Sequence, residues 1–123
     1  MRFEYAAIRV RDLDKAIEFY SEVLGLRFLR RRKMEWTGGE IAMFKDPQSG
    51  QMLELNWYPD AEYREGDELD HLGFQVEDAE TALEKLVHAG CEVAYPMEDR
   101  GEYMYACAID PDGIWIEIYS EKP

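Results

Sequence analysis

The second half of this sequence repeats the first half. Four short stretches have similar counterparts 63 to 66 residues further along the chain: 10–12 with 76–78, 16–18 with 82–84, 46–47 with 110–111, and 52–55 with 115–118. The chain has 123 residues, the length of one ordinary domain, so we expect both copies in a single compact unit. Internal similarity of this kind indicates a duplicated module.

Each copy is predicted to form a strand, a helix and three further strands. The elements expected in the first copy are a strand over 3–10, a helix over 13–24, and strands over 27–36, 40–45 and 51–58. Those of the second copy are a strand over 70–77, a helix over 79–89, and strands over 91–95, 102–109 and 114–119. Asp12 and Asp78 are the expected N-cap residues of the helices. The predicted fold class is therefore α+β, with β-α-β-β-β modules at about 1–58 and 69–123 and a polar linker over 59–68, all in one domain over 1–123.

The repeat brings four polar positions into correspondence. Tyr5 corresponds to His71, and Glu54 corresponds to Glu117. Each alternates with apolar residues along its strand, so we expect it on the strand face away from the helices. The residues of that face are Tyr5, Arg9, Met52, Glu54, Asn56, His71, Gln75, Trp115, Glu117 and Tyr119. Aromatic walls with a few converging polar groups are typical of a small-molecule pocket.

A glutamate between two aliphatic residues has two interpretations. On a face in contact with water it is an ordinary outward residue, whereas on an enclosed face its charge needs a cation or a metal. The equivalent positions of Glu54 and Glu117, with His71 at a third position, favour the metal. Two carboxylates and an imidazole suit zinc, nickel, cobalt, manganese or iron(II), with an open position for water or substrate.

Charge and cysteine content exclude several classes of protein. A net charge of −13 argues against nucleic acid and anionic membranes as partners. No apolar run approaches the roughly 18 residues of a membrane helix, and the first residues have no signal-peptide pattern. Cys91 and Cys107 lack metal-ligand spacing and predict two buried thiols in a reduced, cytoplasmic protein. The basic run 30–33 either protects an edge strand from aggregation or forms a rim that attracts an anionic substrate.

The whole chain resembles the vicinal oxygen chelate superfamily, in which paired β-α-β-β-β modules form a cupped mixed sheet around a metal. The resemblance rests on IRVRDL (8–13), FY (19–20), LG (24–25), ELN (54–56), DHLGF (70–74), DPDG (110–113) and IE (116–117). Within the superfamily the chain is most similar to the short glyoxalase I proteins, the lactoylglutathione lyases. There, each module supplies one metal ligand from its first strand, usually His or Gln, and a Glu from its last strand.

By position, the resemblance gives Tyr5, Glu54, His71 and Glu117 as metal ligands. Three match the pattern and Tyr5 departs from it, because a neutral phenol with a pKa of about 10 is a poor ligand. The site then holds metal through three side chains and water, or through a phenolate, or has been adapted to another use. The extradiol dioxygenase and fosfomycin-resistance branches need His at position 5, so Tyr5 counts against both.

The resemblance also implies a reaction. It is that of a metal-dependent lyase or isomerase, which stabilises the enediolate of a vicinal-oxygen substrate such as a methylglyoxal–thiol hemithioacetal. Glu117 or Glu54 would be the catalytic base. A homodimer is implied as well, with the two ligand pairs supplied by one chain or by two. The alternatives are a metal-free protein of the same fold that binds an antibiotic-type small molecule, or another enzyme of the superfamily. The candidate substrate-binding residues are Arg9, Asn56, Gln75 and Trp115.

Overall fold

The computed structural model describes residues 4–35, 37–64 and 71–122. Contacts within the chain divide it into two compact units, Met1–Tyr63 and Arg64–Pro123, and each is described by itself. The boundary falls inside the segment that the sequence predicts as a linker, and each unit holds one copy of the repeat. The interpretation of the two copies as one domain stays a prediction.

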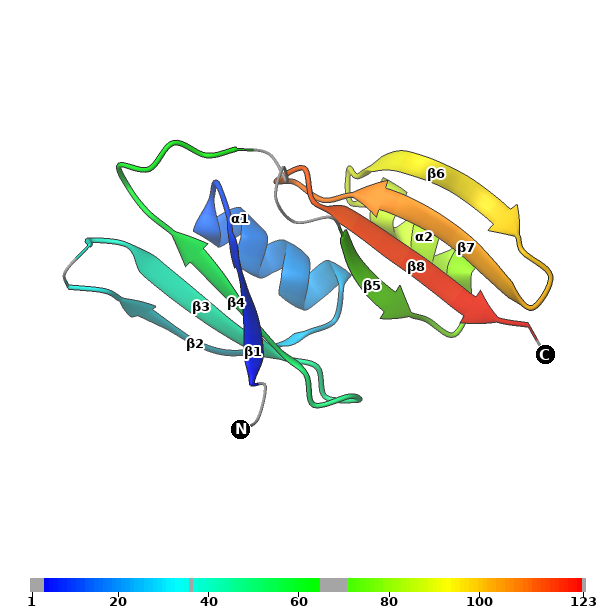
Figure 1. Ribbon diagram of the computed structural model, residues 1–123, viewed down its shortest axis with the longest axis horizontal. Coiled ribbons are helices and arrows are strands. Elements are labelled where there is room, and N and C mark those ends of the chain that lie inside the picture. The colour runs from blue at the N-terminus through cyan, green and yellow to red at the C-terminus, as the bar shows by residue number, and fades with distance from the viewer. Residues whose placement is uncertain (1–3, 36, 65–70, 123) are drawn as a thin grey trace. The chain divides into compact units, whose positions relative to one another are not determined.

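The first unit is a four-stranded sheet with one helix against it (Figure 1). Its elements are β1 (Tyr5–Arg9), α1 (Leu13–Glu18), a π-helical turn η1 (Phe19–Val23), β2 (Arg27–Lys33), β3 (Glu40–Lys45) and β4 (Met52–Trp57). The strand order is β1-β4-β3-β2, with β1 parallel to β4 and the other neighbours antiparallel. The Asp12 side chain accepts a hydrogen bond from the Lys15 backbone N–H and caps α1. Val10, Tyr20, Phe44 and Leu55 are fully buried in the core of this unit.

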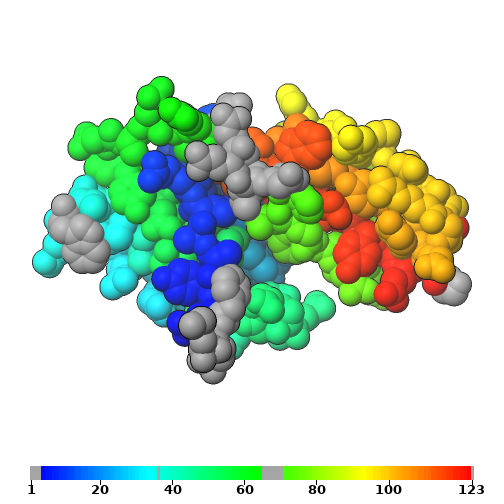
Figure 2. Space-filling model, in the orientation of Figure 1, coloured from blue at the N-terminus to red at the C-terminus, as the bar shows by residue number. Residues whose placement is uncertain are grey.

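The second unit repeats this arrangement. Its elements are β5 (His71–Gln75), α2 (Ala79–His88), β6 (Glu92–Asp99), β7 (Tyr103–Ile109) and β8 (Trp115–Glu121). The strand order β5-β8-β7-β6 is that of the first sheet, again with a parallel first pair. Helix α2 packs against β6, β7 and β8. In the space-filling view, side chains of β7 (orange) and β8 (red) lie beside each other at the surface of this unit (Figure 2).

The two sheets also agree in register, which fixes where the repeated polar residues lie. In the first sheet, Tyr5 lies opposite Met52 and Ala7 lies opposite Glu54. In the second sheet, His71 lies opposite Trp115 and Gly73 lies opposite Glu117. Tyr5 and His71 therefore begin equivalent strands, and Glu54 and Glu117 are both the third residue of the last strand. The correspondence predicted from the repeat is confirmed, as is the order of elements in each module.

The elements differ most from those expected at three places. The helix after Asp12 changes from α to π geometry at Phe19, where a wider turn accommodates an extra residue. Strand β2 ends at Lys33 and not near residue 36. Residue 36, Asp70 and the end of the predicted linker lie outside the described residues. Strand β6 continues through Pro96 to Asp99, because register shifts on either side of Tyr95 and its place as the outermost of the four strands tolerate a proline.

The basic run of the sequence lies on β2, the outermost of the first sheet's four strands. Arg31 bonds Asp14 of α1 and lies 3.0 Å from Glu40 of β3, so its side chain is on the helix side. Its neighbours Arg30 and Arg32 project to the opposite face. This position agrees with a role in keeping the strand from pairing with other chains. Neither helix of the described residues is long and apolar enough to cross a membrane.

Candidate active site

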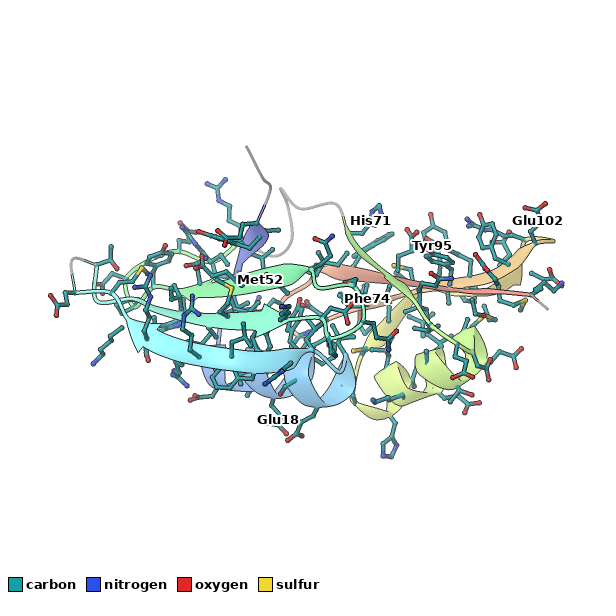
Figure 3. The ribbon with its side chains drawn as sticks, turned by 90° about the horizontal axis from the view of Figure 1, so that it is seen from below. Glu18, Met52, His71, Phe74, Tyr95 and Glu102 are labelled. Carbon is teal, nitrogen blue, oxygen red and sulfur yellow. The ribbon has the colours of Figure 1, made fainter. Side chains whose placement is uncertain are left out.

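His71 and Glu117 form the polar centre of the second sheet. They lie on the adjacent strands β5 and β8, and His71 Nε2 is 3.4 Å from Glu117 Oε2. Figure 3 shows His71 on the face away from α2, whereas Phe74 points to the helix side, as the alternation of the strand requires. Gly73 lies opposite Glu117, and the space where a side chain would stand holds no atom of the described residues within 4 Å. The absence of a side chain there leaves the carboxylate accessible from the β5 side.

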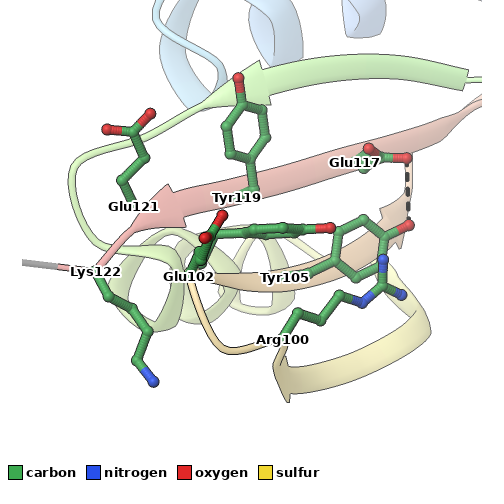
Figure 4. Close-up of a pocket in the computed structure, with 8 residues that line it drawn as sticks. Arg100, Glu102, Tyr105, Glu117, Tyr119, Glu121 and Lys122 are labelled. Carbon is green, nitrogen blue, oxygen red and sulfur yellow. Dashed lines mark hydrogen bonds between the residues drawn. The ribbon is translucent and has the colours of Figure 1, made fainter.

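Tyr105 of β7 contacts the same carboxylate from the other side. Its hydroxyl donates a hydrogen bond to Glu117 Oε2 at 3.2 Å (Figure 4). Burial and the charge of Glu117 raise the pKa of Tyr105 to about 12, so the hydroxyl keeps its proton at neutral pH. The guanidinium of Arg100 lies 3.8 Å from the centre of the Tyr105 ring. Oxygen Oε2 of Glu117 is thus shared by an imidazole and a phenol.

A pocket of about 450 Å³ opens beside Glu117 within the second unit. It runs along β8 to the turn between β6 and β7 (Figure 4). Lys122 holds this rim in place, because its Nζ lies 2.6 Å from a carboxylate oxygen of Asp99 and its N–H donates to the Glu102 carbonyl. The residues that line the pocket are Arg100, Glu102, Tyr103, Tyr105, Glu117, Tyr119, Glu121 and Lys122. Three tyrosines and charges of both signs suit a polar organic molecule better than an aliphatic one.

Aromatic rings surround the polar centre of this sheet. Trp115 lies directly opposite His71 and is 39% exposed. The Tyr95 ring meets Trp115 edge-on at 5.7 Å and lies 6.5 Å from Tyr105. Figure 3 shows Tyr95 and His71 on the same side of the sheet. Gln75, at the end of β5, lies opposite Tyr119 and is exposed on the same face.

The equivalent positions of the first sheet form a different set of contacts. Glu54 is half-buried and accepts a hydrogen bond from Asn56 Nδ2 at 3.0 Å. The Arg9 guanidinium lies 4.8 Å from the centre of the Tyr58 ring, a cation–π contact. Tyr5 is 42% exposed at the start of β1. Asn56 thus contacts Glu54 and lies opposite Arg9 in the sheet, whereas Tyr5 shows no contact with Glu54 among the described residues.

The donors present fit half of a metal site. In the described part of the chain no three His, Cys, Asp or Glu side chains group closely enough to hold a metal ion. His71 and Glu117 nevertheless supply an imidazole nitrogen and a carboxylate at close range, and both are ligands that divalent transition metals accept. Further ligands would come from water or from the substrate.

The sequence of residues 2–118 matches the Glyoxalase family, described as the Glyoxalase/Bleomycin resistance protein/Dioxygenase superfamily. The chain belongs to this family. The match includes both copies of the repeat, and it confirms the resemblance and the fold class expected from the sequence.

Similar proteins in the glyoxalase family include enzymes. The lactoylglutathione lyase of Neisseria meningitidis serogroup A is 33% identical over 130 residues, which cover 99% of this chain and 92% of that protein. The trypanothione-dependent glyoxalase I of Leishmania major is 28% identical, with a TM-score of 0.82 over 98% of this chain and 87% of that chain. An antibiotic binding protein from Streptomyces sp. CB03234 is 20% identical with a TM-score of 0.78, over 99% and 97% of the two chains, and shares the fold alone. The expected similarity to lactoylglutathione lyases, which are enzymes, is confirmed.

Sequence reasoning did not find Tyr105 and Arg100. The alternation of residues 102–109 places Tyr103, Tyr105 and Cys107 on one face, and their register with β8 makes it the face of Glu117. The sequence therefore held a signal for Tyr105, because the same alternation of residues identified the faces of β5 and β8. Arg100 had no such signal, since it lies in the turn between β6 and β7, where side-chain direction follows from the turn and not from a strand period.

Proposed function

We propose that this protein is a metal-dependent isomerase of glyoxalase I type, acting on the hemithioacetal formed from methylglyoxal and a thiol. The observation that supports this best is the pair His71–Glu117, with Nε2 and Oε2 3.4 Å apart, at two of the positions where the resemblance gives metal ligands. Membership of the glyoxalase family supports the class of reaction. The product is a 2-hydroxyacyl thioester, reached by moving one hydrogen between neighbouring carbons and the hydroxyl proton between their oxygens.

The proposed metal ligands are His71, Glu117 and Glu54. His71 binds through Nε2, which already faces the Glu117 carboxylate. Glu54 is included because it is the counterpart of Glu117 in register as well as in sequence. Tyr5 stands at the fourth position, where a neutral phenol is a weak ligand and water takes its place. Nickel, zinc, cobalt, manganese and iron(II) all accept such a set, and a bound divalent ion supplies positive charge against the charge that develops on the substrate's adjacent oxygens.

The chain's own residues carry the proton. A carboxylate, Glu117 or Glu54, takes the proton from one substrate carbon and returns it to the next, acting first as base and then as acid. Glu117 suits this role because Gly73 leaves it accessible and the Tyr105 hydroxyl holds one of its oxygens. A general base of this kind contributes about 10²- to 10⁴-fold to a rate.

Four further residues are proposed to contact the substrate. Arg9 pairs with an anionic group of the thiol, and its position over the Tyr58 ring orients the guanidinium for that contact. Asn56 lies opposite Arg9 and Gln75 lies at the equivalent end of β5, so both offer amides to polar atoms. Trp115 offers an exposed ring beside His71.

A second candidate function is metal-free binding of a small molecule. Two observations favour it: Tyr5 occupies a ligand position, and the pocket beside Glu117 is lined by three tyrosines. This alternative predicts that an aromatic ligand binds with the same affinity before and after metal is removed with a chelator. The isomerase requires binding and turnover to depend on the metal.

The reaction itself tests the proposal. Untagged protein is stripped of metal, reloaded separately with each of the five ions, and incubated with methylglyoxal and glutathione, and the lactoyl thioester is measured by mass spectrometry. We expect product with at least one ion and a loss of at least about 100-fold in kcat for Glu117→Gln. The matched variant Glu84→Gln changes an exposed glutamate on α2 and should keep full activity. Absence of thioester with all five ions would refute the lactoylglutathione lyase reaction.

Two further features complete the proposal. A homodimer is proposed from the family resemblance, and sedimentation of the purified protein measures it directly. Both cysteines are free thiols and buried, which suits the reducing cytoplasm, where we expect the protein to work.

A further inference from the structure

The carboxylate of Glu117 is held by a tyrosine from the middle of its sheet. Tyr105 lies on β7, next to β8, and donates to Glu117 Oε2 at 3.2 Å. His71 Nε2 approaches the same oxygen at 3.4 Å from β5. No hydrogen bond to the other oxygen, Oε1, is present among the described residues. The carboxylate is thereby fixed at one oxygen while the other stays available.

Tyr105 is itself held firmly. It is 9% exposed, its ring centre lies 6.5 Å from that of Tyr95 and 3.8 Å from the Arg100 guanidinium, and it is one of the residues that line the pocket. Arg100 is tied back in turn by a contact with Glu98 and by its backbone hydrogen bond across the β6–β7 turn to Tyr103. A ring packed in this way loses little entropy when its hydroxyl bonds a carboxylate.

The first unit has a similar device with different residues. Glu54, the counterpart of Glu117, accepts a hydrogen bond from the Asn56 amide at 3.0 Å. In each unit the repeated glutamate is thus oriented by one neutral donor on its own sheet. The donor is on β4 in one unit and on β7 in the other, yet both donors bond the repeated glutamate. This recurrence indicates that the orientation of the carboxylate is important for the site, whereas the identity of the donor is not.

We propose that Tyr105 is a positioning residue for Glu117, holding its carboxylate in the orientation that metal binding and proton transfer require. This rests on the proposed function, because Glu117 must be a ligand or base for its orientation to count. Partners that orient a metal ligand typically contribute 10- to 100-fold to metal affinity or activity. Tyr105 would act through Glu117 without contacting the metal.

Removal of one oxygen atom tests the proposal. Tyr105→Phe keeps the ring and its packing and deletes only the donor. Tyr95→Phe is the matched control, because its ring contacts Tyr105 and lies on the same face, while its hydroxyl makes no contact with Glu117. Cobalt(II) titration of each untagged, metal-free protein gives a dissociation constant and a visible spectrum of the bound ion, and kcat and KM are then measured on the loaded proteins. Circular dichroism confirms that both variants are folded.

The outcomes separate this proposal from the function on which it rests. We expect Tyr105→Phe to bind cobalt about 10- to 100-fold more weakly with an altered spectrum, and to lose kcat with little change in KM. Tyr95→Phe should match the wild type within twofold. Equal affinity and spectrum for Tyr105→Phe and wild type would overturn the positioning role and leave the enzyme proposal standing. A wild type that binds neither cobalt nor any of the other four ions would refute the enzyme proposal and this role together.

Discussion

The turn that leads into β8 allows the structure to be tested quantitatively, because the repeat provides its own control. Asp110 is 5% exposed, and its Oδ1 accepts hydrogen bonds from the backbone N–H groups of Asp112 and Ile114, both at 2.8 Å. Asp46 is its counterpart in the first unit and accepts from the N–H groups of Gln48 and Ser49 at 3.1 and 3.2 Å. The two turns use the same residue for the same purpose, but only the second is buried.

Replacement of each aspartate by alanine should therefore have unequal effects. In Asp110→Ala two buried N–H groups lose a charged acceptor, at about 1.5–3 kcal/mol each, so the free energy of unfolding should fall by about 3–6 kcal/mol. In Asp46→Ala water replaces the carboxylate at an exposed turn, and the loss should be about 1–2 kcal/mol. Against a total stability of about 5–15 kcal/mol, the loss expected for Asp110→Ala is a large fraction of the whole.

Urea unfolding followed by circular dichroism measures the difference. With an m value of about 1–3 kcal/mol/M, a gap of about 2 kcal/mol between the variants separates their midpoints by about 1 M, with Asp110→Ala the lower. Equal midpoints, or a loss below about 1 kcal/mol for Asp110→Ala, would contradict the view that these buried hydrogen bonds hold the turn before Glu117.

Three further predictions concern a cap, the thiols and the fourth ligand position. Ser120→Ala removes the hydroxyl oxygen that accepts the Ala79 N–H at 3.0 Å, in a buried position at the start of α2, and should lower the free energy of unfolding in urea by about 1–3 kcal/mol. The control Ser21→Ala in the first unit removes a hydroxyl that donates to the Ile17 carbonyl and should lower it by less than about 1 kcal/mol. Equal losses in the two variants would contradict this prediction. Burial raises the pKa of Cys91 and of Cys107 to about 11 from 9.0, so at pH 8 native thiols should react with a disulfide reagent at least about 100-fold more slowly than unfolded ones. Because unfolded thiols ionise first as pH rises, the same shifts should lower stability between about pH 9 and 11, and flat stability across that range would count against them. Tyr5→His supplies an imidazole at the first-strand position and should raise cobalt affinity at least about tenfold, while unchanged affinity would remove position 5 from the site.

Much of the fold could be predicted because strand alternation and the repeat are properties of the sequence itself. The correspondence of Tyr5 with His71 and of Glu54 with Glu117 followed from sequence similarity alone, and the register of the two sheets bears it out. The helix caps at Asp12 and Asp78 were recognisable for the same reason, because capping is decided by residues within one turn.

What could not be predicted depended on neighbours in space. The strand predicted over 91–95 continues through Pro96, because this strand is outermost in the order and irregular in register on both sides of Tyr95. Tyr105 is linked to Glu117 only through the pairing of β7 with β8, and Arg100 reaches the Tyr105 ring only because the β6–β7 turn folds it back. The Arg9 guanidinium lies over the Tyr58 ring, a choice among neighbours that a sequence leaves open.

Metal content is the most direct test of the central claim that Glu117 belongs to a metal centre. Wild type, Glu117→Ala and the control Glu84→Ala are purified without an affinity tag, loaded with metal, desalted and analysed by elemental mass spectrometry. The account predicts close to one divalent ion per chain in the wild type and in Glu84→Ala, and a large loss in Glu117→Ala. Equal and negligible metal in all three proteins would contradict it and favour metal-free binding of a small molecule.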